Sequence, residues 1–405
     1  MQVVQPRGHE TVRELLRRGV DIPNPLTLDI GPEVDPDRIS ADGVTIHPGC
    51  RIRGAGTVIC AGAQLGAEAP VTIESCCVGP SVELRGGYFS RSVFLEGAGL
   101  GSGAQVRGGT LLEEQAQGAH CVGLKQTILF PFVTLGSLIN FCDCLMSGGT
   151  SRKDHGEVGS SYIHFNFTPD GDKTTASLFG DVPRGVMLDQ PPIFLGGQGG
   201  TVGPVRTGFG TVVAAGSVLR GDINEDNTLV LPRPLPGLRR PVVAQSYKNI
   251  TRIVTRNLEY MANLVALEQW YVHVRRPFFR TQELGPLMFD GALEAIAAGQ
   301  AERARRLAAM VVKVPGGDEG REQLRERIGE LLEVFAEPPT AAPPAELLAG
   351  LSPSVAQAPA GYLTAVRNLP PAVRQAGVAW LRGIVDTLCE QAAELVPAMK
   401  LLARA

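Results

Sequence analysis

The feature that most constrains this chain is an apolar residue that recurs every six positions. The repeat runs in several blocks between residues 46 and 219. A period of six matches neither the 3.6 residues of a helical turn nor the alternation of a simple strand. It fits a short strand followed by a tight turn, with three such units completing one coil of a solenoid. The repeat residues are Ile46, Ile52, Val58, Leu65, Val71, Val78, Leu84, Leu100, Val106, Leu112, Leu135, Phe141, Thr207, Val213 and Leu219.

Glycine content supports the same fold. The 405 residues include 49 glycines, which are concentrated between about positions 43 and 221, and aromatic residues make up only 5%. Glycine accepts positive φ at tight corners, and a narrow interior has little room for large rings. A Gly-rich β-sandwich is the alternative, but the sixfold register persists over too many repeats to favour it. We therefore predict a mainly β chain, a parallel β-helix whose apolar residues stack along its interior.

Composition divides the chain into four parts. We expect an N-terminal cap over residues 1–39, the β-helix over 40–226, an extended Pro-rich strap over 227–245 and an α-helical C-terminal domain over 246–405. Apolar residues in the last part recur at spacings of three and four, which is typical of packed helices. Residues 336–361, rich in Pro and Ala, are expected to form a connector between helices.

Net charge, the length of apolar runs and cysteine spacing argue against several classes of protein. The net charge of −3 gives no support for a nucleic-acid partner. No apolar run is long enough for a membrane span, and the first twenty residues lack the apolar core of a signal peptide. The eight cysteines form no CxxC pair, so we expect reduced thiols in a cytoplasmic protein.

Two stretches carry a family resemblance. They are VRGGTLLEEQAQGAHCVGLKQTILFPFVTLGSLINFCD, residues 106–143, and VGSSYIHFNFTPDGDKTTASLFGD, residues 158–181. The chain resembles the hexapeptide-repeat acyltransferases, which form left-handed parallel β-helices. Within them it is most similar to the C-terminal acetyltransferase domain of the bifunctional UDP-N-acetylglucosamine pyrophosphorylase / glucosamine-1-phosphate acetyltransferase. The resemblance implies a homotrimer whose active sites lie between neighbouring β-helices.

The resemblance also implies a set of site residues. Arg107 falls on the family's phosphate-binding Arg, and Lys125, eighteen residues later, falls on its sugar-nucleotide Lys. The implied substrate-binding set for a sugar phosphate or nucleotide sugar is Arg107, Lys125, Asn140, Asn166, Phe167 and Lys173. The cosubstrate would be acetyl-CoA or another acyl-CoA, and the residues expected near it are Ala214, Ala215 and Arg220.

The catalytic base is the main departure from the family. Ser137 stands at the position of the family's catalytic His, and a serine alone cannot deprotonate an amine. His155 and His164 are the candidate replacements, with Asp154 or Glu157 able to orient an imidazole. We expect His120 to be structural.

A metal site is not expected. The spacing of His120, His155 and His164 is unlike that of a zinc site on this fold, and Cys142 and Cys144 are expected to be buried as small apolar residues.

Three functions fit these observations. The first is an acyl-CoA-dependent transferase that acts on an amino-sugar phosphate or a sugar nucleotide. The second is a non-catalytic protein that binds a sugar nucleotide, as the serine at position 137 suggests. The third is a scaffold without a ligand. The sequence contains no GxGTRM-like loop, so we do not expect uridylyl transfer.

Overall fold

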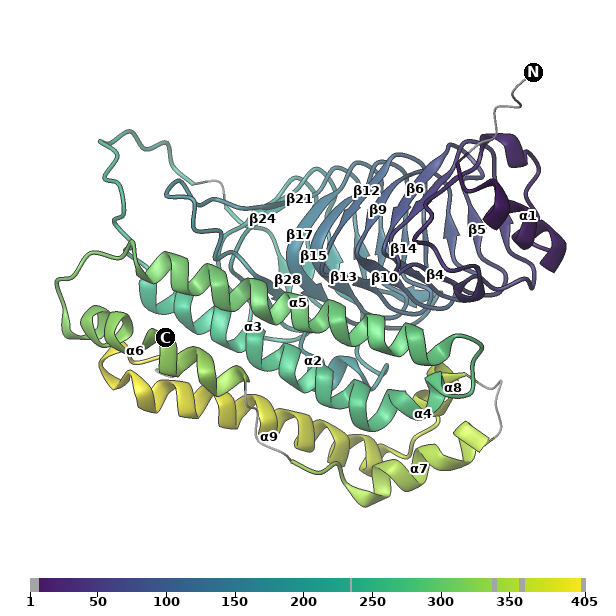
Figure 1. Cartoon of the computed structure of the whole chain (residues 1–405). Helices are drawn as coiled ribbons and strands as arrows, with labels where there is room; N and C mark the ends of the chain where they lie inside the picture. The colour runs from purple at the N-terminus through teal and green to yellow at the C-terminus, as the bar shows by residue number, and fades with distance from the viewer. Residues whose placement is uncertain (1–6, 234, 337–340, 357–360, 402–405) are drawn as a thin grey trace.

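The chain forms a long parallel β-solenoid with a layer of helices along one side (Figure 1). The computed structural model describes residues 7–401 except 234, 337–340 and 357–360, so the first six residues of the expected cap lie outside the described residues. Helix α1 (His9–Arg18) and the short turns η1 (Pro25–Thr27) and η2 (Pro36–Arg38) lie at the N-terminal end of the solenoid. The fold is the predicted one, a β-solenoid followed by helices.

Each coil contributes short strands to three faces, and neighbouring coils pair in parallel. The first face contains β1 (Asp29–Ile30), β3 (Arg51–Arg53), β6 (Val71–Glu74), β9 (Gly87–Ser90), β12 (Ala104–Arg107), β21 (Ile163–Phe165), β24 (Gly200–Val202) and β27 (Val218–Leu219), with the first halves of β15 (Gly123–Leu129) and β17 (Asn140–Met146). The second face contains β4 (Val58–Ile59), β7 (Cys77–Val78), β10 (Ser92–Phe94), β13 (Thr110–Leu112), β22 (Ser177–Phe179) and β25 (Arg206–Thr207), with the second halves of β15 and β17.

The third face closes the coil. It contains β2 (Thr45–Ile46), β5 (Gln64–Leu65), β8 (Glu83–Leu84), β11 (Gly99–Leu100), β14 (Gln117–Gly118), β16 (Thr134–Leu135), β20 (Glu157–Val158), β23 (Phe194–Leu195), β26 (Val212–Val213) and β28 (Leu229–Val230). An antiparallel hairpin of β18 (Gly149–Ser151) and β19 (Asp154–His155) projects from the corner between the second and third faces. Strands β15 and β17 bend from the first face to the second at Gln126 and Asp143, where φ is 52° and 57°.

The residues of the sixfold repeat are all buried, as predicted. On the first face, the interior row runs through Ile30, Ile52, Ile73, Phe89, Val106, Leu124, Phe141, His164, Thr201 and Leu219. Two positions differ from the expected register. Val71 aligns with Gly87, and Ile73, two residues later, is the residue opposite Ile52. Val58 aligns with Cys77 on the outer side of the second face, and Ile59 is the residue that enters the interior.

The outer side of the second face is apolar, which the sixfold repeat does not reveal. Its strands carry two consecutive apolar residues, one for the interior and one for the outside. The outer row is Val58, Cys77, Val93, Leu111, Ile128, Leu145 and Leu178. The row belongs to the same apolar cluster as the helices, so the helices bury it.

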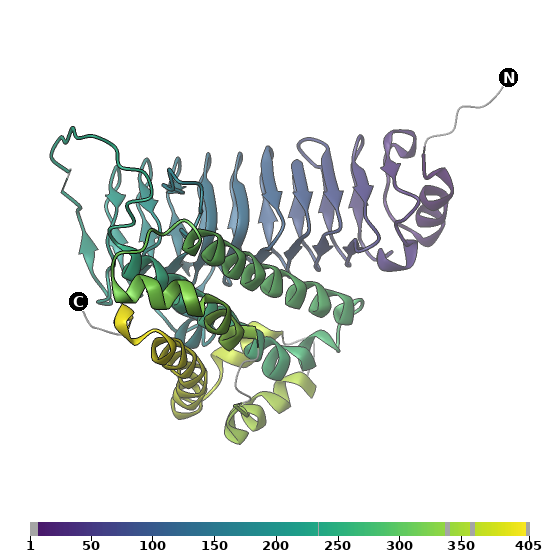
Figure 2. The same ribbon diagram turned by 60° about the vertical axis from the view of Figure 1, so that its left-hand side comes forward.

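The helices run along the solenoid (Figure 2). They are α3 (Ile250–Trp270), the π-helical segment η3 (Tyr271–Arg275), α4 (Arg276–Phe279), α5 (Gly285–Val311), α6 (Glu319–Ala336), α7 (Ala345–Ala356), α8 (Tyr362–Arg367), α9 (Pro371–Leu395) and the turn η4 (Pro397–Met399). Helix α5 contacts β7, β10 and β13, and α3 contacts β22. A Cβ at Gly291 of α5 would lie 2.4 Å from Cys77 Sγ, so only a glycine permits this approach. The expected connector at 336–361 contains a helix, α7.

Buried arginines fix the helices to both corners that border the second face. At the corner with the third face, Arg275 pairs with Glu113 (2.9 Å) and with Glu114. At the corner with the first face, Arg303 Nη2 lies 2.5 Å from Asp143 Oδ1. Burial raises the pKa of Glu113 to about 7, although Arg275 acts in the opposite direction.

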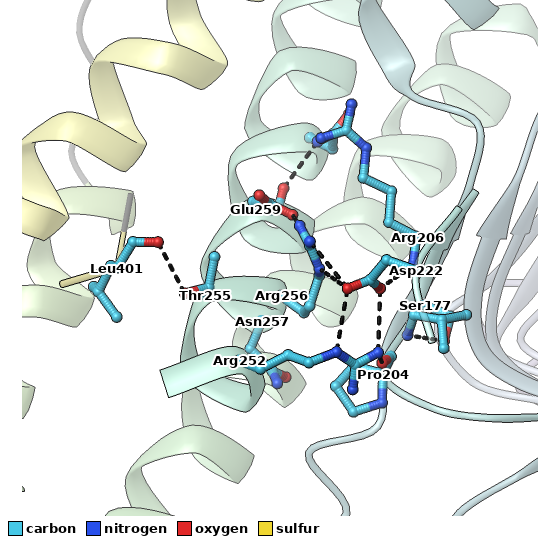
Figure 3. A network of polar contacts seen from close by, with 12 residues as sticks. Ser177, Pro204, Arg206, Asp222, Arg252, Thr255, Arg256, Asn257, Glu259 and Leu401 are labelled. Carbon is cyan, nitrogen blue, oxygen red and sulfur yellow. Dashed lines mark hydrogen bonds and ion pairs between the residues drawn. The ribbon is translucent and has the colours of Figure 1, made fainter. Parts of the chain in front are cut away.

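A third ion-pair cluster fixes α3 to the C-terminal end of the solenoid (Figure 3). Asp222 accepts hydrogen bonds from Arg252 Nε and from Arg256 Nε and Nη2, each at 3.1 Å. Burial opposes ionisation of Asp222, but the hydrogen bond from Arg252 and the charge of Arg256 lower its pKa.

The segment 182–200 also packs within the chain. It begins with helix α2 (Val182–Gly185), which contacts α3 and α9, and Val182 N donates to Asn263 Oδ1 of α3 at 2.9 Å. Among the described helices, none combines the length and apolar character that crossing a membrane requires.

Candidate functional site

Arg107 and Lys125 lie side by side on the outside of the first face. They are direct partners on the adjacent strands β12 and β15, which are about 4.8 Å apart in a sheet. Each follows an interior residue, Val106 or Leu124, so the alternation of the strand turns both charged side chains outward. The Arg107 guanidinium lies 4.4 Å from the centre of the Tyr88 ring. Two exposed cations on neighbouring coils can bind the oxygens of one phosphate group.

A groove lies beside this pair, between the solenoid and helix α5. Its volume is about 1030 Å³, and both Arg107 and Lys125 line it. Sequence reasoning missed three other charged residues of its lining, which are Arg91, Glu74 and Glu294. Arg91 stands at the corner between the first and second faces, and Glu294 comes from α5. Only the packing of the helical region on the second face places α5 beside this groove, and no local motif signals it.

Asn140 is on the same face, one coil beyond Lys125. It pairs with Gly123 of β15 and Ile163 of β21. Its Oδ1 accepts a hydrogen bond from Cys142 Sγ at 3.1 Å. The structure therefore brings three of the expected substrate residues together, Arg107, Lys125 and Asn140.

Asn166, Phe167 and Lys173 lie in the loop that joins β21 to β22. The Asn166 amide donates to Asp143 Oδ2 at 3.3 Å and accepts from the Thr175 hydroxyl, so it already has partners within the chain. The Lys173 carbonyl accepts from Arg303 Nη1 at 3.2 Å, while its side chain is exposed. Phe167 is 72% exposed. The loop stands at the corner between the first and second faces.

His164 lies inside the solenoid and cannot reach a ligand on its surface. It is 2% exposed, its ring is in contact with Phe141 and Phe179, and its Nε2 lies 2.7 Å from Ser177 Oγ. Burial lowers the pKa of His164 to about 4. We therefore correct the expectation that His164 is a surface base: it is a neutral core residue.

His155 is on the opposite side of the solenoid from Arg107 and Lys125. It belongs to the hairpin at the corner between the second and third faces, and that corner does not border the first face. His155 Nδ1 is 3.0 Å from the Arg152 carbonyl oxygen, and Nε2 is 4.0 Å from Glu157 Oε2. Glu157 therefore lies beside His155, but the two side chains do not face the groove.

An unexpected pair of polar side chains stands at the corner between the third and first faces. His120 Nδ1 lies 2.9 Å from Ser137 Oγ, and His120 is exposed. The two residues belong to successive coils: Leu138 N donates to the His120 carbonyl at 3.0 Å. The sequence signal is weak, because their seventeen-residue separation is meaningful only once the coil length is known.

Ala214, Ala215 and Arg220 lie near the C-terminal end of the solenoid. The backbone hydrogen bonds from Leu138, Ser161, Gln198 and Gly216 to the preceding coils place Ala215 on the same corner row as Ser137. That row is His120, Ser137, Ser160, Gly197 and Ala215. Arg220 follows β27 on the first face. In the described part of the chain, no group of three or more His, Cys, Asp or Glu side chains could hold a metal ion.

The fold and this surface define a β-solenoid protein with a helical C-terminal region and a basic pair on one face. Curated relatives named Bifunctional protein GlmU are homologous to about half of the chain. The relative from Pelobacter propionicus is 28% identical over 214 residues, which are 52% of this chain and 41% of the relative. The relative from Kineococcus radiotolerans is 28% identical over 218 residues, 53% of this chain and 39% of the relative. The relative from Thermotoga petrophila is 27% identical over 213 residues, 52% and 42%.

These matches confirm the resemblance drawn from the sequence. The chain spans about two fifths of the length of these relatives. No protein family model matches it.

Proposed function

We propose that this chain is an acyl-CoA-dependent transferase that acylates the amine of an amino-sugar phosphate or of a related nucleotide sugar. The observation that carries the proposal is the pairing of Arg107 with Lys125 beside the groove under α5. A phosphate or diphosphate held there by charge-assisted hydrogen bonds would leave the sugar free to extend over the first face. The homology to GlmU proteins supports the same class of substrate.

The corner row supports a place for the cosubstrate. The residues that follow Ser137 along this corner row are small: Ser160, Gly197 and Ala215. An extended acyl-CoA arm lying along this row would bring its thioester to the edge of the first face. Arg220, exposed on the first face, is a cation available to the phosphates of the coenzyme. Acetyl-CoA is the donor we propose to test first.

A homotrimer and a cytoplasmic location remain part of the proposal. Helices cover the second face, so subunits would associate through the first and third faces. Exposed apolar residues are present on both: Leu138, Ile163 and Phe165 on or beside the first, and Phe194 and Val212 on the third. The mass of the protein in solution tests this assembly directly.

A thermal-shift screen of the full chain tests the function. The ligands are UDP-N-acetylglucosamine, glucosamine-1-phosphate, acetyl-CoA and free coenzyme A. A ligand that binds only the folded protein raises the melting temperature by mass action. Stabilisation by a sugar phosphate and by a coenzyme A species supports the transferase. Stabilisation by the sugar nucleotide alone supports a non-catalytic binding protein, and no shift with any ligand supports a scaffold.

A further inference from the structure

Acyl transfer to an amine requires a base, and a histidine is the side chain best suited to that role near neutral pH. The chain has six histidines. His164 is buried in the solenoid, and His155 stands on the corner opposite the first face. His9 is in α1, and His273 packs against Trp380 in the helical region. His47 and His120 remain, and both stand on the corner between the third and first faces.

His47 and His120 differ in their distance from Lys125. His47 follows β2 and His120 follows β14, four coils further along the third face, which is about 19 Å at ~4.8 Å per coil. His120 is in the same coil as Lys125. Five residues of extended chain separate them, at most about 16 Å at ~3.3 Å per residue. The Lys125 side chain, a sugar phosphate and the imidazole can together cover that span.

We propose that His120 is the general base of the transfer reaction and that Ser137 positions it. The inference rests on the proposed function. In this arrangement the His120 Nδ1–H donates to Ser137 Oγ across 2.9 Å. That hydrogen bond selects the tautomer whose Nε2 carries the free lone pair, and Nε2 is the atom that accepts a proton.

The transfer needs only the acceptor amine, the acyl-CoA thioester and the His120 imidazole. The amine nitrogen of the acceptor attacks the thioester carbonyl carbon, the C–N bond forms and the C–S bond breaks. His120 Nε2 takes the proton that the nitrogen loses. The same proton then passes to the departing coenzyme A thiolate, so the imidazole returns to its neutral form.

Ser137 is fixed by the next coil as well as by His120. Its backbone N–H donates to Ser160 Oγ at 3.1 Å. His120 itself lines a hollow of about 310 Å³ on the side of the third face, together with Glu68, Glu83 and Arg85. These are the charged groups that face the imidazole from the third-face side. The two carboxylates pair with Arg85, at 3.3 and 2.9 Å.

The test compares full-length variants in an acetyl-CoA:glucosamine-1-phosphate transfer assay, with binding of each ligand measured by calorimetry. His120→Asn should lower kcat by about 10²–10⁴-fold with dissociation constants unchanged. Ser137→Ala should lower kcat by about tenfold, the effect of losing one hydrogen bond, and Ser137→Thr should restore it. The pH dependence that a titrating base imposes on kcat should be missing in His120→Asn. His155→Asn is the matched control and should behave as the wild type.

The outcomes separate the two proposals. Turnover in the wild type together with normal kcat in His120→Asn overturns the assignment of the base and leaves the transferase standing. A wild type that binds both ligands without turnover overturns the transferase and the base together. A second, independent readout is the imidazole tautomer: nitrogen NMR of the free protein should show Nδ1–H at His120 in the wild type and a loss of that preference in Ser137→Ala. An unchanged tautomer in Ser137→Ala overturns the positioning role of Ser137.

Discussion

The first and second faces of the solenoid are built from the same coils, yet their outer sides differ completely. Strands β15 and β17 pass through both faces, so one strand serves two environments. Outside the first face are exposed Arg107, Lys125 and Asn140, whereas outside the second face is an apolar row under α3 and α5. One face is used for packing, and the other remains available for a ligand. The following predictions test that division.

The largest effect should come from the corner of the second face. Arg275→Ala leaves the carboxylates of Glu113 and Glu114 buried without their cation. We expect a loss of about 3–5 kcal/mol in the free energy of unfolding. Urea denaturation followed by circular dichroism measures it. Arg107→Ala on the first face is the control and should change stability by less than about 0.5 kcal/mol. Equal losses in the two variants would contradict the division.

The apolar row should come next. Leu111→Ala removes a fully buried side chain from between β13 and the helices, and we expect a cost of about 2–5 kcal/mol. Gln105→Ala, at an exposed position of β12 on the first face, is the matched change and should be nearly neutral. The same denaturation experiment compares them. A neutral Leu111→Ala would mean that the helices do not depend on this row.

His164, buried on the interior side of the first face, should make the free energy of unfolding depend on pH. The pKa of His164 falls from its usual 6.5 to about 4 because the ring is buried. The unfolded chain therefore takes up a proton at higher pH than the folded chain does. The stabilisation is fully present above about pH 6.5 and is lost as the pH falls toward 4, by on the order of 3 kcal/mol. The raised pKa of Glu113 contributes a slope of the opposite sign in every variant. The difference in unfolding free energy between the wild type and His164→Gln, measured from pH 7 to 4, should therefore carry the His164 slope, whereas the difference between the wild type and His120→Gln should not.

The smallest expected change is in the free energy of ligand binding. Arg107→Ala should weaken binding of glucosamine-1-phosphate or UDP-N-acetylglucosamine about 10- to 100-fold, the value of a charge-assisted hydrogen bond. Titration calorimetry measures the dissociation constants. Arg51→Ala, on the same face three strands earlier, should leave them unchanged. If both variants bind as the wild type does, the basic pair is not the phosphate site.

The sequence predicted the solenoid because its interior repeats in every coil. It did not predict the outer row of the second face, because pairs such as Val58–Ile59 and Leu111–Leu112 look like irregularities in a single repeat. Once the coil length is known, the first residue of each pair, Val58 or Leu111, belongs to a separate outer row, and that row predicts that another element covers it.

At the candidate site, the sequence misplaced two residues, His164 and His155. In Ile163–His164–Phe165 the apolar residues point outward and the histidine points inward, the reverse of what hydrophobicity favours. Register decides this, since His164 stacks between Phe141 and Thr201. The inserted hairpin at 149–155 hides that register in the sequence. The same insertion made His155 look close to the site, although it lies at the far corner.

The approach of α5 at Gly291 has a consequence for how the protein comes apart. In a solenoid each coil contacts only its neighbours, so coils can open one at a time from an end. Helix α5, with 27 residues, is about 40 Å long at ~1.5 Å per residue. It lies across the strands β7, β10 and β13 of three successive coils. Coils joined to one rigid rod must open together. Amide hydrogen exchange should therefore report one shared opening event for these coils, while fraying is confined to the coils that α5 does not reach.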